Sequence, residues 1–204
     1  NTAIGYQSMD GDWTTAAHVN SVAIGRGTMR GVLTSTSSGS VVVGLSALTA
    51  LTSGGYNTVV GYQAAQALTL GGSNTVIGYQ ALVSMVGTDA TNGGNFNVAI
   101  GRSAMEGVNN DGHANCEQDG NIAIGYASLY GGTLDGDKDL VGNIAIGNNA
   151  LNATGTNAQT GTIAIGSDAL GALTSGSGNT AVGYQALATN VDGDFNTAVG
   201  YESL

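Results

Sequence analysis

The sequence predicts an all-β fold, a parallel β-solenoid of about eleven coils, each seventeen to twenty-four residues long. Three observations predict it. A motif of the type Asn-Thr-Ala-Ile-Gly recurs along the whole chain, every residue just before its glycine is β-branched, and Gly/Asn/Ser/Asp clusters separate the copies. Units this short bury their apolar side chains only by stacking on their neighbours, which is the behaviour of a solenoid.

The motif glycine sets the length of each coil. Its copies are Gly5, Gly25, Gly44, Gly61, Gly78, Gly101, Gly125, Gly147, Gly166, Gly183 and Gly200. The shortest spacing is 17 residues and occurs four times, for example from Gly44 to Gly61, and longer units carry their extra residues after the motif. We therefore treat 1–204 as a single repeat domain, with looped coils at 5–44 and 78–147 and regular coils at 44–78 and 147–204. Because both ends fall inside a repeat, we expect a fragment of a longer chain.

The three residues before each motif glycine are predicted to form a strand. The first is Thr, Val or Ile, the second is Ala or Val, and the third is Ile or Val. Side chains alternate between the faces of a strand, so the first and third share one face and the second lies on the other. Both faces are apolar, which is typical of a strand buried on both sides. One face can fill the interior of the coil, and the other needs a partner. The small Ala side chains suit a close approach of another chain or another sheet, which favours an oligomer.

Other columns of the repeat predict the rest of the coil. Four residues after the glycine stands an apolar residue, usually Leu or Met, in a short strand, a tight turn or a short helical turn that points into the core. Asn recurs four residues before the glycine and predicts a hydrogen-bonded ladder along the axis. Tyr follows the glycine in six coils, where it either stacks or forms a glycan-binding strip.

Composition excludes several classes of protein. The chain has 204 residues, a net charge of −10 and only four basic residues, too few to bind nucleic acid. It contains no window of 18 apolar residues, so no membrane insertion is expected in this segment. Its single cysteine, Cys116, rules out a disulfide within the chain.

The repeat resembles two families of fibrous protein. Asn-Ser-Val-Ala-Ile-Gly at 20–25 resembles the repeat of trimeric autotransporter adhesin heads. Asn-Thr-Val-Ile-Gly-Tyr-Gln-Ala-Leu at 74–82, with its variant at 179–187, is similar to repeats of phage tail fibres. The resemblance covers nearly the whole chain, although the coil is longer than in the adhesins. It implies a left-handed, homotrimeric β-roll at an extracellular location, on a virion tail fibre or a cell surface.

Insertions in the longer coils are the candidate receptor-binding loops. Insertions in solenoids map to one side, often the binding side. Our candidates for contact with a cell-surface glycan or protein receptor are Trp13, Asn109, Asp111, His113, Asp119 and Asp137. Decoration without function is the alternative for these loops.

One acidic loop has the beginning of a Ca²⁺-binding pattern. Asp135, Asp137 and Asp139 alternate as the first ligands of an EF-hand loop do. The pattern then fails, because Leu140 stands where glycine is required and Ile146 where glutamate is required. The hypothesis is an irregular Ca²⁺ site, the alternative is a solvated turn, and no other cofactor is expected.

No catalytic constellation is visible, so we do not expect an enzyme. The acidic residues are scattered over loops, whereas a glycan-degrading β-helix should cluster carboxylates on one face of successive coils. An ice-binding solenoid would need a regular outward Thr array, and Val or Ile interrupts that column. A self-assembling extracellular filament is a further alternative. The leading interpretation is a structural, adhesive fibre segment, a stiff shaft that presents loops for attachment to a host or surface.

Overall fold

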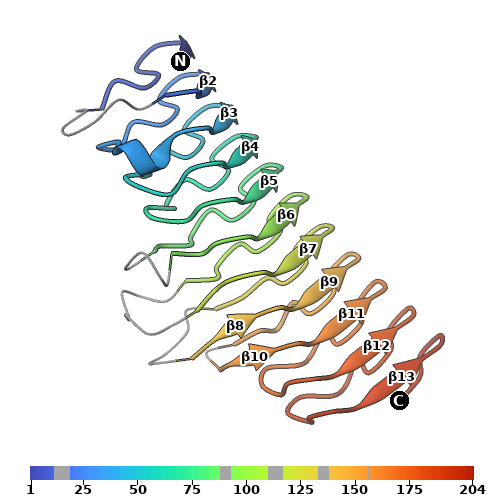
Figure 1. The fold of residues 1–204 in the computed structure, drawn as a ribbon. Coiled ribbons are helices and arrows are strands. Elements are labelled where there is room, and N and C mark those ends of the chain that lie inside the picture. The colour runs from blue at the N-terminus through green and yellow to red at the C-terminus, as the bar shows by residue number, and fades with distance from the viewer. Residues whose placement is uncertain (12–18, 88–92, 110–116, 133–137, 156) are drawn as a thin grey trace.

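The computed structural model describes residues 1–11, 19–87, 93–109, 117–132, 138–155 and 157–204. It is a parallel β-solenoid, as predicted. One short strand of each coil joins a single eleven-stranded parallel sheet. The strands are β1 (Thr2–Ile4), β2 (Val22–Ile24), β3 (Val41–Val43), β4 (Thr58–Val60), β5 (Thr75–Ile77), β6 (Val98–Ile100), β7 (Ile122–Ile124), β9 (Ile144–Ile146), β11 (Ile163–Ile165), β12 (Thr180–Val182) and β13 (Thr197–Val199). Figure 1 shows them as the rungs of a ladder that runs from one terminus to the other.

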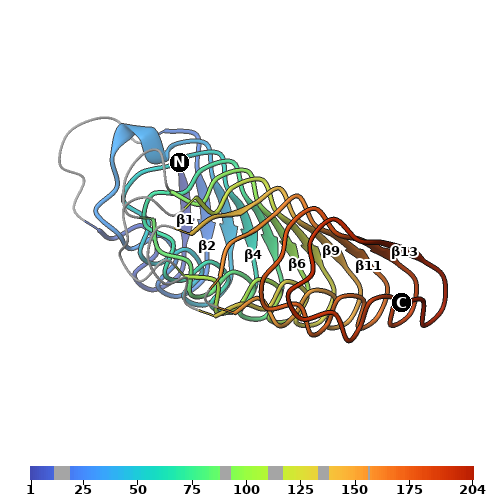
Figure 2. The same ribbon diagram turned by 90° about the horizontal axis from the view of Figure 1, so that it is seen from below.

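The register of the sheet follows the repeat in every coil. Each strand residue pairs with its motif equivalent, for example Val59 with Val76 and Ala99 with Ala123. The first pair joins coils whose equivalent positions are 17 residues apart in the chain, and the second joins coils 24 residues apart. Seen along a second direction, the strands still lie side by side on one wall of the coil (Figure 2). The extra residues of the long coils therefore do not disturb the stacking.

The interior of the coil holds the Ala/Val column, which corrects our assignment of the two strand faces. The middle strand residues, such as Ala23, Val42 and Ala99, are fully buried within this one chain. The prediction that the Ala column approaches another chain is therefore wrong. The physical reason is lack of space: the same core cluster contains large side chains such as Leu48 and Leu82 from the turn, so only small residues fit beside them.

The residues after the motif glycine form a tight turn. Alternate residues of this turn have positive φ, for instance Gln80 at 53° and Leu82 at 53°. This backbone belongs to neither a strand nor a helix, so the turn alternative of our prediction is confirmed. The Leu of the turn is fully buried at position 82, as expected for a side chain that closes the core.

The motif glycine is required by both its conformation and its neighbours. Gly61 has φ +145°, and a Cβ atom there would lie 2.1 Å from the carbonyl oxygen of Gly78 in the next coil. No side chain fits at that distance. Each glycine of the column thus lets two coils approach to the normal spacing of paired strands.

A ladder of buried Asn side chains runs through the core, as predicted. Asn74 donates both its backbone N–H and its Nδ2 to the Asn57 Oδ1, each at 3.0 Å. Asn121 donates its Nδ2 to the Leu140 carbonyl at 2.7 Å, and Asn143 donates in the same way to Gln159 at 2.8 Å. The ladder therefore joins neighbouring coils through side chains as well as through the backbone.

A second, two-stranded parallel sheet contains the Leu140 and Gln159 carbonyls that accept these Asn hydrogen bonds. It pairs β8 (Leu140–Val141) with β10 (Gln159–Thr160). The remaining regular element is a single turn of 3-10 helix, η1 (Ser35–Ser37). Neither was predicted from the repeat.

Candidate functional site

The first and third residues of the eleven strands form what we call the outward sheet face. All of them are Thr, Val or Ile, so the face carries no charge in a chain with 14 acidic residues. Ile77 is 39% exposed and Val60 37%, in the middle of the rod, and the end residues Ile4 and Val199 are more exposed still. This uncharged strip of Thr, Val and Ile is therefore a candidate interaction surface.

A ladder of aromatic and guanidinium groups borders the outward sheet face. Tyr62 and Tyr79 stack with ring centroids 5.2 Å apart and planes 9° apart. The guanidinium of Arg102 then lies 5.6 Å from the Tyr79 ring centroid and 5.8 Å from that of Tyr126. Arg102 interrupts the Tyr column in the sequence, but it continues the stack in space through cation–π contacts.

The same stacking recurs at the two ends of the rod. Tyr184 and Tyr201 stack with centroids 5.2 Å apart, and the guanidinium of Arg26 lies 5.8 Å from the Tyr6 ring centroid. The predicted stacking of the Tyr column is thus confirmed where tyrosines stand in adjacent coils. The neighbouring Glu202 raises the pKa of the Tyr201 phenol, first through a hydrogen bond and then through its charge.

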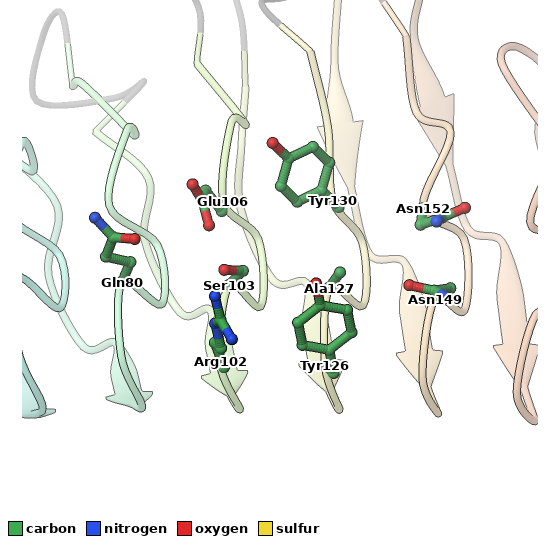
Figure 3. Close-up of a pocket in the computed structure, with 9 residues that line it drawn as sticks. All are labelled: Gln80, Arg102, Ser103, Glu106, Tyr126, Ala127, Tyr130, Asn149 and Asn152. Carbon is green, nitrogen blue, oxygen red and sulfur yellow. The ribbon is translucent and has the colours of Figure 1, made fainter.

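An open hollow of about 400 Å³ lies beside the middle of this ladder (Figure 3). Four successive coils contribute to it, each through its turn after the motif glycine. The lining residues are Gln80 from the first coil, Arg102, Ser103 and Glu106 from the second, Tyr126, Ala127 and Tyr130 from the third, and Asn149 and Asn152 from the fourth. The hollow, named here the Arg102 hollow, thus exists only because the coils stack.

The side chains of the Arg102 hollow stand in rows along the rod. Figure 3 shows Glu106, Tyr130 and Asn152 in one row, with Arg102 and Tyr126 in a second row nearer the strands. The Tyr126 and Tyr130 side chains are about half exposed, at 48% and 41%. Within the described residues the one ion pair joins Arg30 to Asp10. Neither Arg102 nor Glu106 therefore forms a salt bridge with another described residue.

Every lining residue of the hollow occupies one of three columns of the repeat, the first, second or fifth after the motif glycine. Sequence reasoning examined the first of these columns and missed the other two. The column five residues after the motif glycine carries Glu106, Tyr130 and Asn152 in consecutive coils. A concentration of large polar side chains in neighbouring positions of one column is the signal that would have found the hollow.

The receptor-loop candidates only partly fall on described residues. Trp13, Asp111, His113 and Asp137 lie outside them. Asn109 is half-buried. The remaining candidate, Asp119, is half-buried and stabilises the stacking of coils.

Asp119 and Asp139 both accept hydrogen bonds from the backbone of the preceding coil. The Asp119 Oδ1 accepts one from the Asn95 N–H at 2.6 Å, and the Asp139 Oδ1 accepts one from the Glu117 N–H at 3.0 Å. These two carboxylates therefore have a structural role in the described part of the chain.

The Ca²⁺ hypothesis stays a prediction. Asp135 and Asp137, its first two ligands, lie outside the described residues. Among the residues that are described, no group of three or more His, Cys, Asp or Glu side chains is placed to hold a metal ion. The third proposed ligand, Asp139, accepts a backbone hydrogen bond from Glu117.

Comparison with known proteins gives no relative: no family model, curated protein or solved structure matches the chain. In the part of the chain that the structure describes, no helix has the length and apolar character needed to cross a membrane.

Proposed function

We propose that this chain is a shaft segment of an extracellular fibre, on a phage tail or a bacterial surface, that works as a homotrimer and attaches to a host or surface. The observation that carries the proposal is the outward sheet face, an uncharged strip of Thr, Val and Ile along the whole eleven-stranded sheet. The rod supplies length and stiffness, and the turns and loops beside the strip supply contacts.

The charge distribution favours a second copy of the chain as the partner of the outward sheet face. Two copies with a net charge of −10 repel one another wherever their acidic residues meet. The outward sheet face carries none of these residues, so it is where copies can approach. Burying its exposed Ile and Val side chains contributes roughly 25 cal/mol for each Å² of apolar surface.

The regular spacing of the strip favours a symmetric assembly. Each coil presents two outward side chains from the same two strand positions, so the strands of one copy can match those of another along the rod. Closed rotational symmetry then lets every copy bury the same face. The count of three follows from the resemblance to trimeric adhesin heads, and it is the feature that the experiment must measure.

Stiffness supports the role of a shaft. Ten strand-to-strand steps of about 4.8 Å give the sheet a length of about 48 Å. Backbone hydrogen bonds join neighbouring coils on both sides of the strand, for example from Thr75 N to Asn97 O and from Gly101 N to Ile77 O, each at 2.8 Å. In a structure built in this way each coil is held by both of its neighbours.

Sedimentation equilibrium tests the proposal. We expect the wild-type chain to sediment at three times its mass of 20.1 kDa. The double variant Ile77→Lys, Ile124→Lys places charges on the outward sheet face and should sediment as a monomer, since burying unpaired ammonium groups is unfavourable.

Val191→Lys is the matched control, because Val191 is 49% exposed but does not belong to the outward sheet face. It should stay trimeric, and circular dichroism should show all three proteins folded. A wild-type chain that is a stable folded monomer would overturn the proposal.

A further inference from the structure

We propose that the Arg102 hollow binds one uncharged hexopyranose unit of a surface glycan. This rests on the proposed function as an attachment segment and assigns the ligand class of one contact site. The hollow measures about 400 Å³, within the range of small-molecule sites. Its lining consists of described residues alone, and none of them is one of the predicted receptor-loop residues.

The aromatic side of the hollow fits the apolar face of a pyranose ring. Tyr126 and Tyr130 come from the same coil and are both about half exposed. The face of an aromatic ring carries partial negative charge, and the axial C–H groups of a sugar carry partial positive charge, so the two attract. Each Tyr hydroxyl adds a polar group at the far end of its ring.

The polar side of the hollow fits sugar hydroxyls. The guanidinium of Arg102 lies between the rings of Tyr79 and Tyr126 and carries N–H groups that can donate to sugar hydroxyls. Glu106 supplies a carboxylate acceptor, and the amides of Asn149 and Asn152 supply both donors and acceptors. A hydroxyl group donates and accepts, so a mixed set of this kind matches a row of hydroxyls.

The charges in the hollow favour an uncharged sugar. Arg102 and Glu106 together contribute no net charge to the lining. A sialic or uronic acid would meet the Glu106 carboxylate and the field of a chain with a net charge of −10. A protonated amino sugar would instead meet the Arg102 guanidinium. The neutral hexopyranose avoids both repulsions.

Because the hollow is open, we expect one hollow to bind a sugar weakly and a homotrimer to bind a polysaccharide more tightly. A site open on one side buries only part of a sugar, so we expect a dissociation constant on the order of 1 mM for one hollow. A homotrimer carries three copies of it. Simultaneous contacts to one polysaccharide then raise the overall affinity by a factor of about 100 or more.

Two binding experiments test the inference on the intact chain. A glycan array should retain the protein on oligosaccharides that end in glucose, galactose, mannose or N-acetylglucosamine, and not on sialylated or sulfated ones. Saturation-transfer NMR with the free oligosaccharides that the array retains should show ring protons in contact with the protein. Tyr126→Ala and Glu106→Gln should each weaken binding about tenfold or more, because the first removes one wall of the hollow and the second replaces a charged acceptor with a weaker neutral one.

Tyr184→Ala is the matched control, since Tyr184 belongs to the same Tyr column but lies outside the hollow. It should bind as the wild type does. Binding to none of the neutral sugars, binding only to acidic ones, or an equal loss in Tyr184→Ala would each overturn the inference.

The failure of this inference differs from the failure of the fibre proposal. A trimeric protein that binds no neutral sugar would refute sugar binding in the Arg102 hollow but not the proposed homotrimeric shaft. A monomeric wild type that still shows saturation transfer refutes the homotrimer and leaves the hollow standing. The monomeric double variant Ile77→Lys, Ile124→Lys should lose retention on the array and keep its saturation-transfer signal, because its single hollow is intact.

Discussion

At the scale of single residues, the φ angle and the space beside the backbone together decide where glycine is required. The motif glycines have φ between +128° and +146°, a region that side chains rarely adopt, and all but the last, Gly200, lie against the backbone of the next coil. Gly142 is different: its φ is +66°, and a Cβ atom there would meet nothing within 4 Å. At Gly142 only the backbone conformation opposes a side chain, whereas at the motif glycines the backbone of the next coil opposes it as well.

This difference predicts two unequal losses of stability. Gly61→Ala should lower the free energy of unfolding by about 4 kcal/mol or more, since the methyl group collides with the Gly78 carbonyl and the backbone is strained as well. Gly142→Ala should lower it by only about 1–2 kcal/mol, the cost of a left-handed backbone for alanine. Urea unfolding followed by circular dichroism measures both. Equal losses would show that the next coil does not restrict position 61.

At the scale of elements, the main strands could be predicted and the second sheet could not. The β-branched column predicted all eleven strands of the main sheet, because its residue types recur in every coil. β8 and β10 have two residues each and come from coils of different length, so no column of the alignment contains them. They form because stacking has already brought Leu140 and Gln159 to the same level.

The assignment of faces failed for a different reason. Alternation shows which side chains of a strand share a face, but it does not show which face is inside. Only the volume of the assembled core decides that, and the Leu and Met side chains of the turns already occupy most of it. The candidate site could not be predicted for the same reason. Arg102, Tyr126 and Asn149 come from three successive coils and are brought together only when the coils stack.

The Asn ladder predicts opposite effects for two positions of one column. Asn121 is fully buried and bonded both to its neighbours in the ladder and to Leu140. Asn121→Val should lower the free energy of unfolding by about 3 kcal/mol or more, because several buried groups lose their partners. Thr162 stands in the same column, and its buried hydroxyl has no hydrogen-bond partner among the described residues.

Thr162→Val should therefore leave the free energy of unfolding unchanged or raise it by up to about 1 kcal/mol, since valine has the same shape without the unpaired hydroxyl. Thermal unfolding of the two variants in the same buffer provides the comparison. A marked loss of stability in Thr162→Val would mean that its hydroxyl has a partner, such as a buried water molecule.

At the scale of the whole molecule, the rod behaves as a stack of interchangeable coils. Each coil contacts only the coils before and after it, so stability is close to a sum of equal interface terms. Deleting residues 62–78 removes one complete coil of the shortest length and joins Gly61 to Tyr79, the residue that follows the next motif glycine.

We expect the deletion of 62–78 to fold, with a melting temperature within about 5 °C of the wild type. Small-angle scattering should show a rod about 4.8 Å shorter. Deleting only residues 62–69 is the control, because the segment 70–78 that remains is about half as long as the shortest coil and cannot complete one. That variant should lose cooperative unfolding. Equal tolerance of both deletions would contradict a rod built from whole coils.

The constant register of coils that differ in length has a consequence for how such a molecule changes over generations. The coils of β4 and β5 are 17 residues apart and those of β6 and β7 are 24 residues apart, yet both pairs join equivalent residues. Lengthening an inserted segment costs little, about 0.6 kcal/mol for each doubling. Natural variation can therefore add, remove or exchange peptide between coils while the shaft stays the same, and the same sites are suited to the display of foreign peptides.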